Sequence, residues 1–277
     1  MPVIVVPCTR APVPEIAFAP RRPPAAPANL ARPFLIDLHC HILPALDDGA
    51  LDLRDSLAMG RQAADDGIEA ICATPHIRHD HDVRIEQLAD RVEAVNQGLR
   101  DEGIPVTVLQ GGEVAETAVE TLGEEELSRV TLGEGSWVLL EPAPGPLSDT
   151  LVRRVEYLAE RGHRALIAHP ERHLSADMYE RIVALIVAGA LVQATADFFL
   201  RERTAAGMRS LAEAGLIHVL SSDAHSSLGG RPVQMSEPFE VLTGIESLAP
   251  HVEWMRETAP RAIVAGTDLS LPFGPAV

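Results

Sequence analysis

The sequence predicts an α/β fold, best arranged as a closed or nearly closed β/α barrel. Three observations support this prediction. Seven short aliphatic runs alternate with longer amphipathic segments, the composition does not shift between them, and each run ends in polar residues. Parallel strands joined by crossover helices produce this alternation. Seven units in one uninterrupted stretch favour a barrel over a doubly wound sheet.

The predicted elements follow one another from residue 34 to the C-terminal region. The aliphatic runs that predict strands are 34–39, 68–76, 106–113, 136–142, 164–170, 190–197 and 217–225. The segments that predict helices are Leu51–Asp66, Val83–Asp101, Ser148–Arg161, Ala176–Ala188, Thr204–Ala214 and Glu237–Glu246. The segment at Ser148 shows the helix signals clearly, because Ser148 and Asp149 can cap its start and Gly162 stops it.

We expect two parts in the chain. Residues 1–33 are rich in Pro, Ala and Arg and predict an extension without a packed core, whereas residues 34–277 predict a single domain. The extension lacks the pattern of a secretory signal, and no run reaches the roughly 18–20 apolar residues of a membrane span. We therefore expect a cytoplasmic protein without membrane insertion.

The composition excludes several kinds of chemistry. The formal net charge is −17, which repels nucleic acid. All 23 basic residues are Arg, so Schiff-base chemistry, a Walker A motif and a carbamylated lysine bridge are excluded. The cysteines at 8, 40 and 72 are too few for a disulfide framework and fit a reducing compartment.

Polar residues gather at the carboxyl end of each predicted strand, which is where β/α barrels build their active sites. The candidates are His39 and His41, His76, Glu113, Glu141, His169, Asp223 and His225, with Asp197 less well supported at the sixth strand. A single histidine is more often a packing residue, and we assign His163, His218 and His251 to that role. The recurrence at strand after strand favours a shared metal site.

The spacing supports metal binding. Residues i and i+2 of a strand face the same side, so His39 and His41 can address one ion while Cys40 points into the packing. Asp223 and His225 repeat this spacing. The mixture of imidazole and carboxylate suits Mn²⁺, Fe²⁺ or Zn²⁺, and so many ligands imply two or three ions that share bridging carboxylates. Such clusters activate water for attack at phosphorus or carbonyl carbon.

Two arginines in rim loops narrow the substrate class. Arg172 follows His169, and Arg231 follows His225. Arginine is a bidentate partner for phosphate oxygens, so the pair favours a phosphorylated substrate. The alternative is a structural ion pair, for example between Arg172 and Glu171.

The motifs "DLHCHILPALDDGA", "ATPH", "GGEV", "LLE", "AHPER" and "SSDAHSSLGGRP" occur in this order. Together, over residues 34–271, they resemble the bacterial protein-tyrosine phosphatases of the PHP (polymerase and histidinol phosphatase) superfamily, CpsB/CapC/YwqE type. The resemblance implies a distorted (β/α)7 TIM-like barrel, the PHP fold, with a trinuclear metal site. It also implies a role in capsule or exopolysaccharide biosynthesis.

The resemblance assigns roles to individual positions. The implied metal ligands are His39, His41, Asp48, His76, Glu113, Glu141, His169, Asp223 and His225, with Glu113 as the bridge. Glu141 matches a position that varies between His and carboxylate in the superfamily. Arg172 and Arg231 match the phosphate-holding arginines, and with Asp48 and His225 they form the expected catalytic set. Asp47 is expected to support its neighbours.

The implied substrate is a phosphotyrosine protein, such as the tail of a bacterial tyrosine autokinase. A homo-oligomer is compatible with the sequence.

Two motifs depart from the family. The second motif reads "TPHIRHDHDV" instead of continuing "TPHH", which offers His79 and His81 in the pocket loop. The sixth strand reads "QAT" at 193–195 where the family has "QIN". Both departures concern substrate preference more than metal chemistry.

Several alternatives stay open at this point. Another PHP phosphoesterase acting on a small substrate such as histidinol phosphate would share the cluster. A TatD-type nuclease or another amidohydrolase-like barrel shares the His-x-His opening, and a metal-binding regulatory protein needs no turnover. Cys72 and Arg78 also have the Cys-x5-Arg spacing of cysteine-dependent phosphatases. That loop is normally Gly-rich, however, and this one contains Pro75 and lies in an aliphatic run.

Overall fold

The computed structural model describes residues 35–275, so the predicted extension at 1–33 lies outside the described residues. The strands are β1 (Leu35–Cys40), β2 (Ile68–Ala73), β3 (His76–Ile77), β4 (Thr107–Gln110), β5 (Glu113–Ala115), β6 (Trp137–Glu141), β7 (Arg164–Ile167), β8 (Leu191–Thr195) and β9 (Val219–Ser221). They form a three-stranded sheet, β1-β2-β4, and a six-stranded sheet, β3-β5-β6-β7-β8-β9. Every pairing within these sheets is parallel.

Two of the predicted strands are each divided into two short pieces. The predicted strand at 68–76 breaks at Thr74 and Pro75, because proline cannot donate a hydrogen bond to a sheet. The predicted strand at 106–113 breaks at Gly111 and Gly112. A Cβ on Gly112 would lie 2.9 Å from Cγ1 of Ile77. If each divided strand is counted once, seven strand positions remain, as predicted.

The two sheets meet between β1 and β9. Asp223 N donates to His39 O at 2.8 Å, and His41 N donates to Ala224 O at 2.9 Å. These bonds place the end of β9 beside β1, which is the neighbour relationship expected in the predicted barrel. The predicted α/β class with parallel strands is confirmed by this arrangement.

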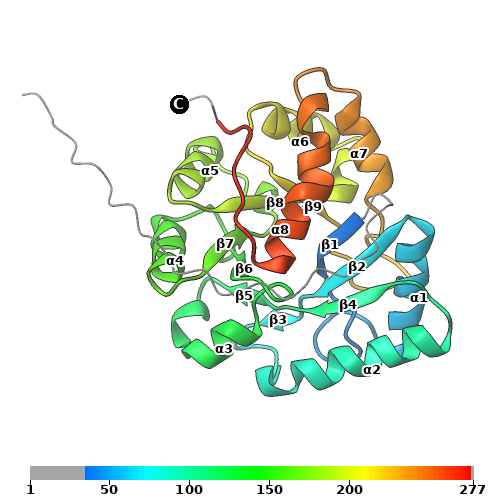
Figure 1. Cartoon of the computed structure of the whole chain (residues 1–277). Helices are drawn as coiled ribbons and strands as arrows, with labels where there is room; N and C mark the ends of the chain where they lie inside the picture. The colour runs from blue at the N-terminus through cyan, green and yellow to red at the C-terminus, as the bar shows by residue number, and fades with distance from the viewer. Residues whose placement is uncertain (1–34, 276–277) are drawn as a thin grey trace, which may run out of the picture.

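The helices lie outside the strands (Figure 1). They are α1 (Leu53–Asp65), α2 (Leu88–Asp101), α3 (Glu124–Arg129), α4 (Asp149–Glu160), α5 (Met178–Val187), α6 (Ala205–Glu213), α7 (Ser236–Thr243) and α8 (Ala259–Ala265). Six of them confirm the six predicted helical segments. Each of these six buries apolar side chains. Across the described part of the chain, every helix falls short of the length and apolarity that a membrane crossing needs.

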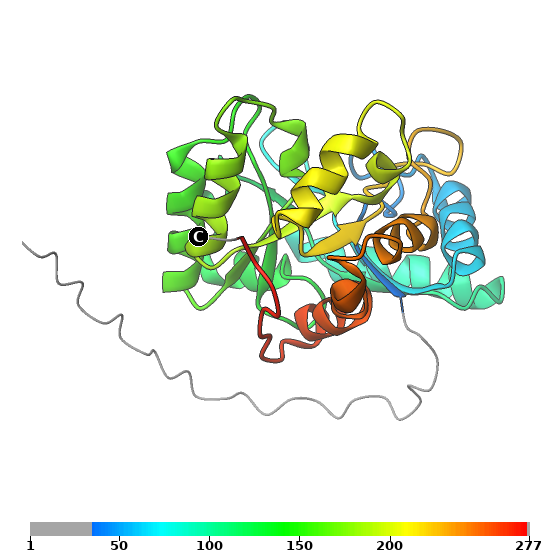
Figure 2. The ribbon, with the colours of Figure 1, turned by 90° about the horizontal axis from the view of Figure 1, so that it is seen from above.

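The last helix covers one end of the strands (Figure 2). A π-helical turn at Trp254–Thr258 leads directly into α8, and neither element is among the helices predicted from the sequence. Ile263 of α8 packs with inward-facing strand residues such as Leu38 and Leu166 in one buried cluster. These apolar side chains fill the space between the strands in their amino-terminal half, and the polar residues lie at the carboxyl ends.

Candidate active site

The predicted polar residues lie at the carboxyl ends of the strands. His39 lies at the end of β1, with His41 just beyond it, and Glu113 begins the second piece of its divided strand. His169 and Asp223 lie two residues beyond the ends of β7 and β9, respectively. His39 Nε2 lies 3.2 Å from His41 Nε2, which confirms that the two side chains face the same region. Cys40 is fully buried among packing residues, as predicted.

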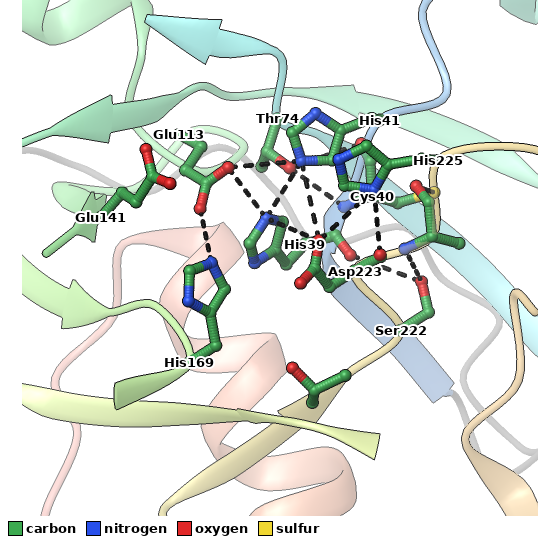
Figure 3. Close-up of polar contacts among 12 residues, drawn as sticks. His39, Cys40, His41, Thr74, Glu113, Glu141, His169, Ser222, Asp223 and His225 are labelled. Carbon is green, nitrogen blue, oxygen red and sulfur yellow. Dashed lines mark hydrogen bonds and ion pairs between the residues drawn. The ribbon is translucent and has the colours of Figure 1, made fainter. Parts of the chain in front are cut away.

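Glu113 contacts several imidazoles, of which Figure 3 shows His39, His41 and His169. Its Oε2 atom lies 3.3 Å from Nε2 of both His39 and His41, and 3.0 Å from Nδ1 of His76. Its Oε1 atom lies 2.9 Å from Nε2 of His169. Burial alone would raise the pKa of Glu113, but the surrounding imidazoles hold it well below its usual range. A buried carboxylate shared by four imidazoles has the placement of a bridging ligand.

The potential ligand atoms fall into overlapping groups, in each of which the atoms lie within 4.8 Å of one another. Among the described residues these groups are His41–Asp48–His76–His225, His39–His41–Asp223, His39–Glu113–His169 and His76–Glu113–Glu141. Together they contain all nine predicted ligands. The donor set is imidazole and carboxylate, which fits Mn²⁺, Fe²⁺ or Zn²⁺. The overlap fits a cluster of ions better than one isolated ion.

The two aspartates of the "DDG" motif have different environments. The Asp48 side chain is 61% exposed, and its Oδ1 atom lies 3.4 Å from His76 Nε2 and 3.6 Å from His225 Nε2. Asp47 is nearly buried and accepts hydrogen bonds from His41 Nδ1 at 2.7 Å and from His76 N at 2.9 Å. Gly49 must be glycine, because a Cβ there would lie 2.3 Å from His41 O. The geometry thus offers Asp48 as a ligand and Asp47 as a support.

Two supporting residues were not among the predicted site residues. Gln193 Oε1 lies 3.1 Å from His39 Nδ1 and also accepts the backbone N–H of His169 at 3.3 Å. Asp37 accepts hydrogen bonds from the backbone and hydroxyl of Ser222, and burial raises its pKa to about 6. The polar Gln193 in an aliphatic run was a visible signal, because buried polar groups need partners.

The backbone is strained at two of the candidate ligands. His169 has φ 31° and Asp223 has φ 51°, which places both in the left-handed region. Non-glycine residues adopt this region only when the surrounding structure holds them there. Both residues lie two positions beyond the end of a strand, and their side chains contact Glu113 and His39, respectively.

Both arginines lie beside the candidate metal ligands. Arg231 Nη2 lies 3.0 Å from Oδ1 of Asp223, and Arg172 contacts Oδ2 of the same carboxylate. The alternative pair of Arg172 with Glu171 is not formed, because Glu171 Oε1 accepts the backbone N–H of Thr195 at 2.8 Å. Burial alone would raise the pKa of Asp223, but nearby histidines and these two guanidinium groups lower it.

A cavity of about 360 Å³ opens over the cluster. Its lining residues are Asp48, His76, Arg78, Glu113, Glu141, His169, Arg172, Asp223, His225, Gly230 and Arg231. Burial and the nearby His41 lower the pKa of His225 to about 4. The cavity therefore combines carboxylates and imidazoles on its floor with three guanidinium groups on its wall.

Three further features of the sequence are outside the ligand groups themselves, although one of them contacts a candidate ligand. Cys72 is fully buried in the inner apolar cluster, where burial raises its pKa, so its spacing to Arg78 does not form a phosphate loop. Asp197 forms an ion pair with Arg201. In the rewritten loop, the ring of His81 stacks on His76 at 5.2 Å, whereas His79 is exposed.

Fold and site together define a class of protein, namely a parallel α/β barrel with a candidate polynuclear metal site at the carboxyl ends of its strands. Residues 35–245 match the family described as capsular polysaccharide synthesis, CpsB/CapC. Because this match spans most of the sequence, the chain belongs to the CpsB/CapC family. The family resemblance seen in the motifs is thereby confirmed.

Individual relatives agree with this assignment. The chain is 36% identical over 204 residues to the tyrosine-protein phosphatase YwqE of Bacillus subtilis, covering 69% of this chain and 78% of the relative. It is 25% identical over 224 residues to the tyrosine-protein phosphatase CpsB of Streptococcus pneumoniae, covering 75% and 89%.

Solved structures show the same relationship. A structure from the study of YwqE and CpsB, described there as unique metal-dependent tyrosine phosphatases, aligns with a TM-score of 0.74 and 29% identity, covering 88% of this chain and all of that one. The dihydropyrimidinase of Brevibacillus agri aligns with a TM-score of 0.53 at 10% identity, over 88% of this chain and 74% of that one. This second likeness shows the fold alone.

Proposed function

We propose that this chain is a metal-dependent protein-tyrosine phosphatase. The observation that carries the proposal is Glu113, buried among four imidazoles at the floor of a cavity whose wall holds Arg172 and Arg231. Relatives in the family named as tyrosine-protein phosphatases support the substrate class.

The proposal assigns the residues as follows. The side chains that would hold two or three divalent ions are His39, His41, Asp48, His76, Glu113, Glu141, His169, Asp223 and His225. Ions bound there would supply an activated water and would neutralise charge on the phosphoryl group. Mn²⁺, Fe²⁺ and Zn²⁺ suit this donor set.

The protein itself binds and orients the phosphoryl group. Arg172 and Arg231 hold its non-bridging oxygens, which adds positive charge where negative charge builds up during transfer. The leaving group of phosphotyrosine is a phenolate, whose conjugate phenol has a pKa of about 10, so it needs only modest protonation. Asp48 and His225 stand at the open side of the cluster, where the phosphoryl group enters.

We infer that the physiological substrate is a phosphotyrosine protein of capsular polysaccharide synthesis, because the family is described by that process. The phosphotyrosine tail of a bacterial tyrosine autokinase in an exopolysaccharide system is the substrate that the resemblance suggests. Within the described residues both cysteines, Cys40 and Cys72, are free, which supports action in a reducing compartment such as the cytoplasm.

A substrate panel tests the function. The purified chain, supplied with Mn²⁺, is offered a phosphotyrosine peptide, a phosphoserine peptide, histidinol phosphate and single-stranded DNA. We expect turnover of the phosphotyrosine peptide, its loss with a chelator, and no turnover by the double variant H39A/H41A. Preference for histidinol phosphate would show a small-molecule phosphatase instead. Turnover of DNA alone would show a nuclease, and inactivity of a metal-loaded sample would show a binding protein.

A further inference from the structure

Two exposed leucines lie in the loops that also carry residues of the cavity wall. Leu51 is 68% exposed and Leu228 is 80% exposed, the highest value among the large hydrophobic residues in the described part of the chain. Single exposed leucines are common on protein surfaces and need no explanation. These two differ from that background because hydrogen bonds through one carboxylate join their backbones, in two loops that also line the candidate active site.

The carboxylate of Asp55 joins the two leucines, which we call the leucine pair. Leu51 N donates to Asp55 Oδ2 at 3.1 Å, and Ser226 Oγ donates to the same oxygen at 2.9 Å. Leu228 N in turn donates to Ser226 Oγ at 3.1 Å. Three consecutive hydrogen bonds therefore connect the two backbones. Asp55 is itself buried, so its carboxylate holds both loops against the interior of the protein.

The same loops carry the cavity wall. Leu51 comes three residues after Asp48, and Leu228 lies between His225 and Arg231, and all three of these neighbours line the cavity. The loop after β9 runs beside the start of α1 (Figure 2). The leucine pair thus places two exposed apolar side chains in the same loops that line the polar cavity.

We propose that the leucine pair binds an apolar side chain next to the phosphotyrosine of the protein substrate. This inference rests on the proposed function. A phosphotyrosine that enters the cavity leaves its flanking residues on the rim, where the pair can bury them. Acidic flanks are disfavoured, because the net charge of −17 repels them. A stable dimer needs roughly 800 Å² buried on each partner, far more than two leucine side chains provide.

The experiment compares three substrates in steady-state kinetics. They are a phosphotyrosine peptide flanked on both sides by leucine, the same peptide flanked by serine, and p-nitrophenyl phosphate, which has no flanking chain. The test variant is L51S/L228S. The control is V187S, because Val187 is 70% exposed but ends α5 at the opposite end of the strands.

We expect the wild type to prefer the leucine-flanked peptide by about tenfold in kcat/KM, mainly through KM. L51S/L228S should lose this preference and keep its activity on p-nitrophenyl phosphate within about twofold, while V187S should match the wild type throughout. A wild type without preference, or a double variant that keeps it, would overturn the inference and leave the phosphatase assignment standing. A dimer that dissociates in L51S/L228S, seen by sedimentation, would assign the pair to self-association and also overturn it. Failure of the wild type on all three substrates would overturn the phosphatase function itself.

Discussion

The Nδ1 atom of His41 lies 2.7 Å from Oδ2 of Asp47, and this carboxylate also accepts the backbone N–H of His76. Asp47 therefore connects the first and second sequence motifs. The bond directs Nε2 of His41 toward Glu113, as a carboxylate behind a metal-binding imidazole does in many sites. Burial alone would lower the pKa of His41, but the hydrogen bonds to Asp47 and Glu113 raise it to about 10.

We expect D47N to weaken metal binding more than it weakens folding. Loss of such a support typically lowers metal affinity by about 10–100-fold. The Mn²⁺ concentration that gives half-maximal phosphatase activity should rise by that factor, and excess Mn²⁺ should restore much of the activity. D268N is the control, because Asp268 is fully exposed. An unchanged Mn²⁺ dependence in D47N would show that Asp47 has no supporting role.

Asp55 should matter for both stability and activity. It receives hydrogen bonds from Ser227 N at 2.8 Å and Ser227 Oγ at 2.6 Å, in addition to those from Leu51 and Ser226. Because these bonds end on a charged group, D55A should lower the free energy of unfolding by about 2–4 kcal/mol in urea denaturation.

The same substitution should also raise KM for p-nitrophenyl phosphate, because the loop anchored by Asp55 carries Arg231. S227A is the graded control, since it removes one neutral donor and leaves the Ser227 N–H, and it should cost only about 1 kcal/mol. Equal effects of D55A and S227A would contradict the role of the carboxylate.

The arginines should act on the phosphoryl group rather than on folding. We expect R172A and R231A each to lower kcat/KM for a phosphotyrosine peptide by about 10²–10³-fold and to weaken inhibition by inorganic phosphate. R231K should recover part of the loss, because lysine keeps the charge but not the bidentate fork. R164A is the control, since Arg164 starts β7 at the other end of the strands. Unchanged phosphate inhibition in both variants would assign the arginines to structural pairing with Asp223.

His218 predicts a pH dependence of stability. It is fully buried, its Nδ1 atom accepts the backbone N–H of Val192 at 3.0 Å, and burial lowers its pKa to about 4. The unfolded chain, with a pKa of about 6.5, binds the proton more readily, so the stabilisation is complete above pH 6.5 and is lost as the pH falls toward 4.

At pH 5 this loss amounts to about 2 kcal/mol. The variant H218N can keep an acceptor but cannot titrate in this range. Between pH 7.5 and pH 5, its free energy of unfolding should therefore fall by about 2 kcal/mol less than that of the wild type. Parallel pH curves for the two proteins would contradict the buried neutral state of His218.

The sequence was informative where a residue's role depends on its neighbours in the chain. The alternation in "HCH" correctly separated His39 and His41 from Cys40, and the position of Glu113 after an aliphatic run placed it at the rim. The aliphatic runs also marked all seven strand positions. The breaks within two of them depend on Pro75 and on the close approach of Gly112 to Ile77.

The supporting contacts could not be predicted because they join distant segments. Gln193 lies 154 residues from its partner His39, and Asp37 lies 185 residues from Ser222. Arg172 lies 51 residues before its partner Asp223. The helix α8 was missed because Pro260 interrupts its pattern, although proline is tolerated in the first turn of a helix.

The central claim is that imidazoles and carboxylates at the carboxyl ends of the strands bind a metal cluster. Anomalous diffraction from crystals of the full chain grown with Mn²⁺ tests it most directly. We predict two or three anomalous peaks in the cavity. Glu113 should contact more than one of them, with ligand distances of about 2.0–2.3 Å. A cavity without any peak, in crystals that are shown to contain Mn²⁺ elsewhere, would contradict it.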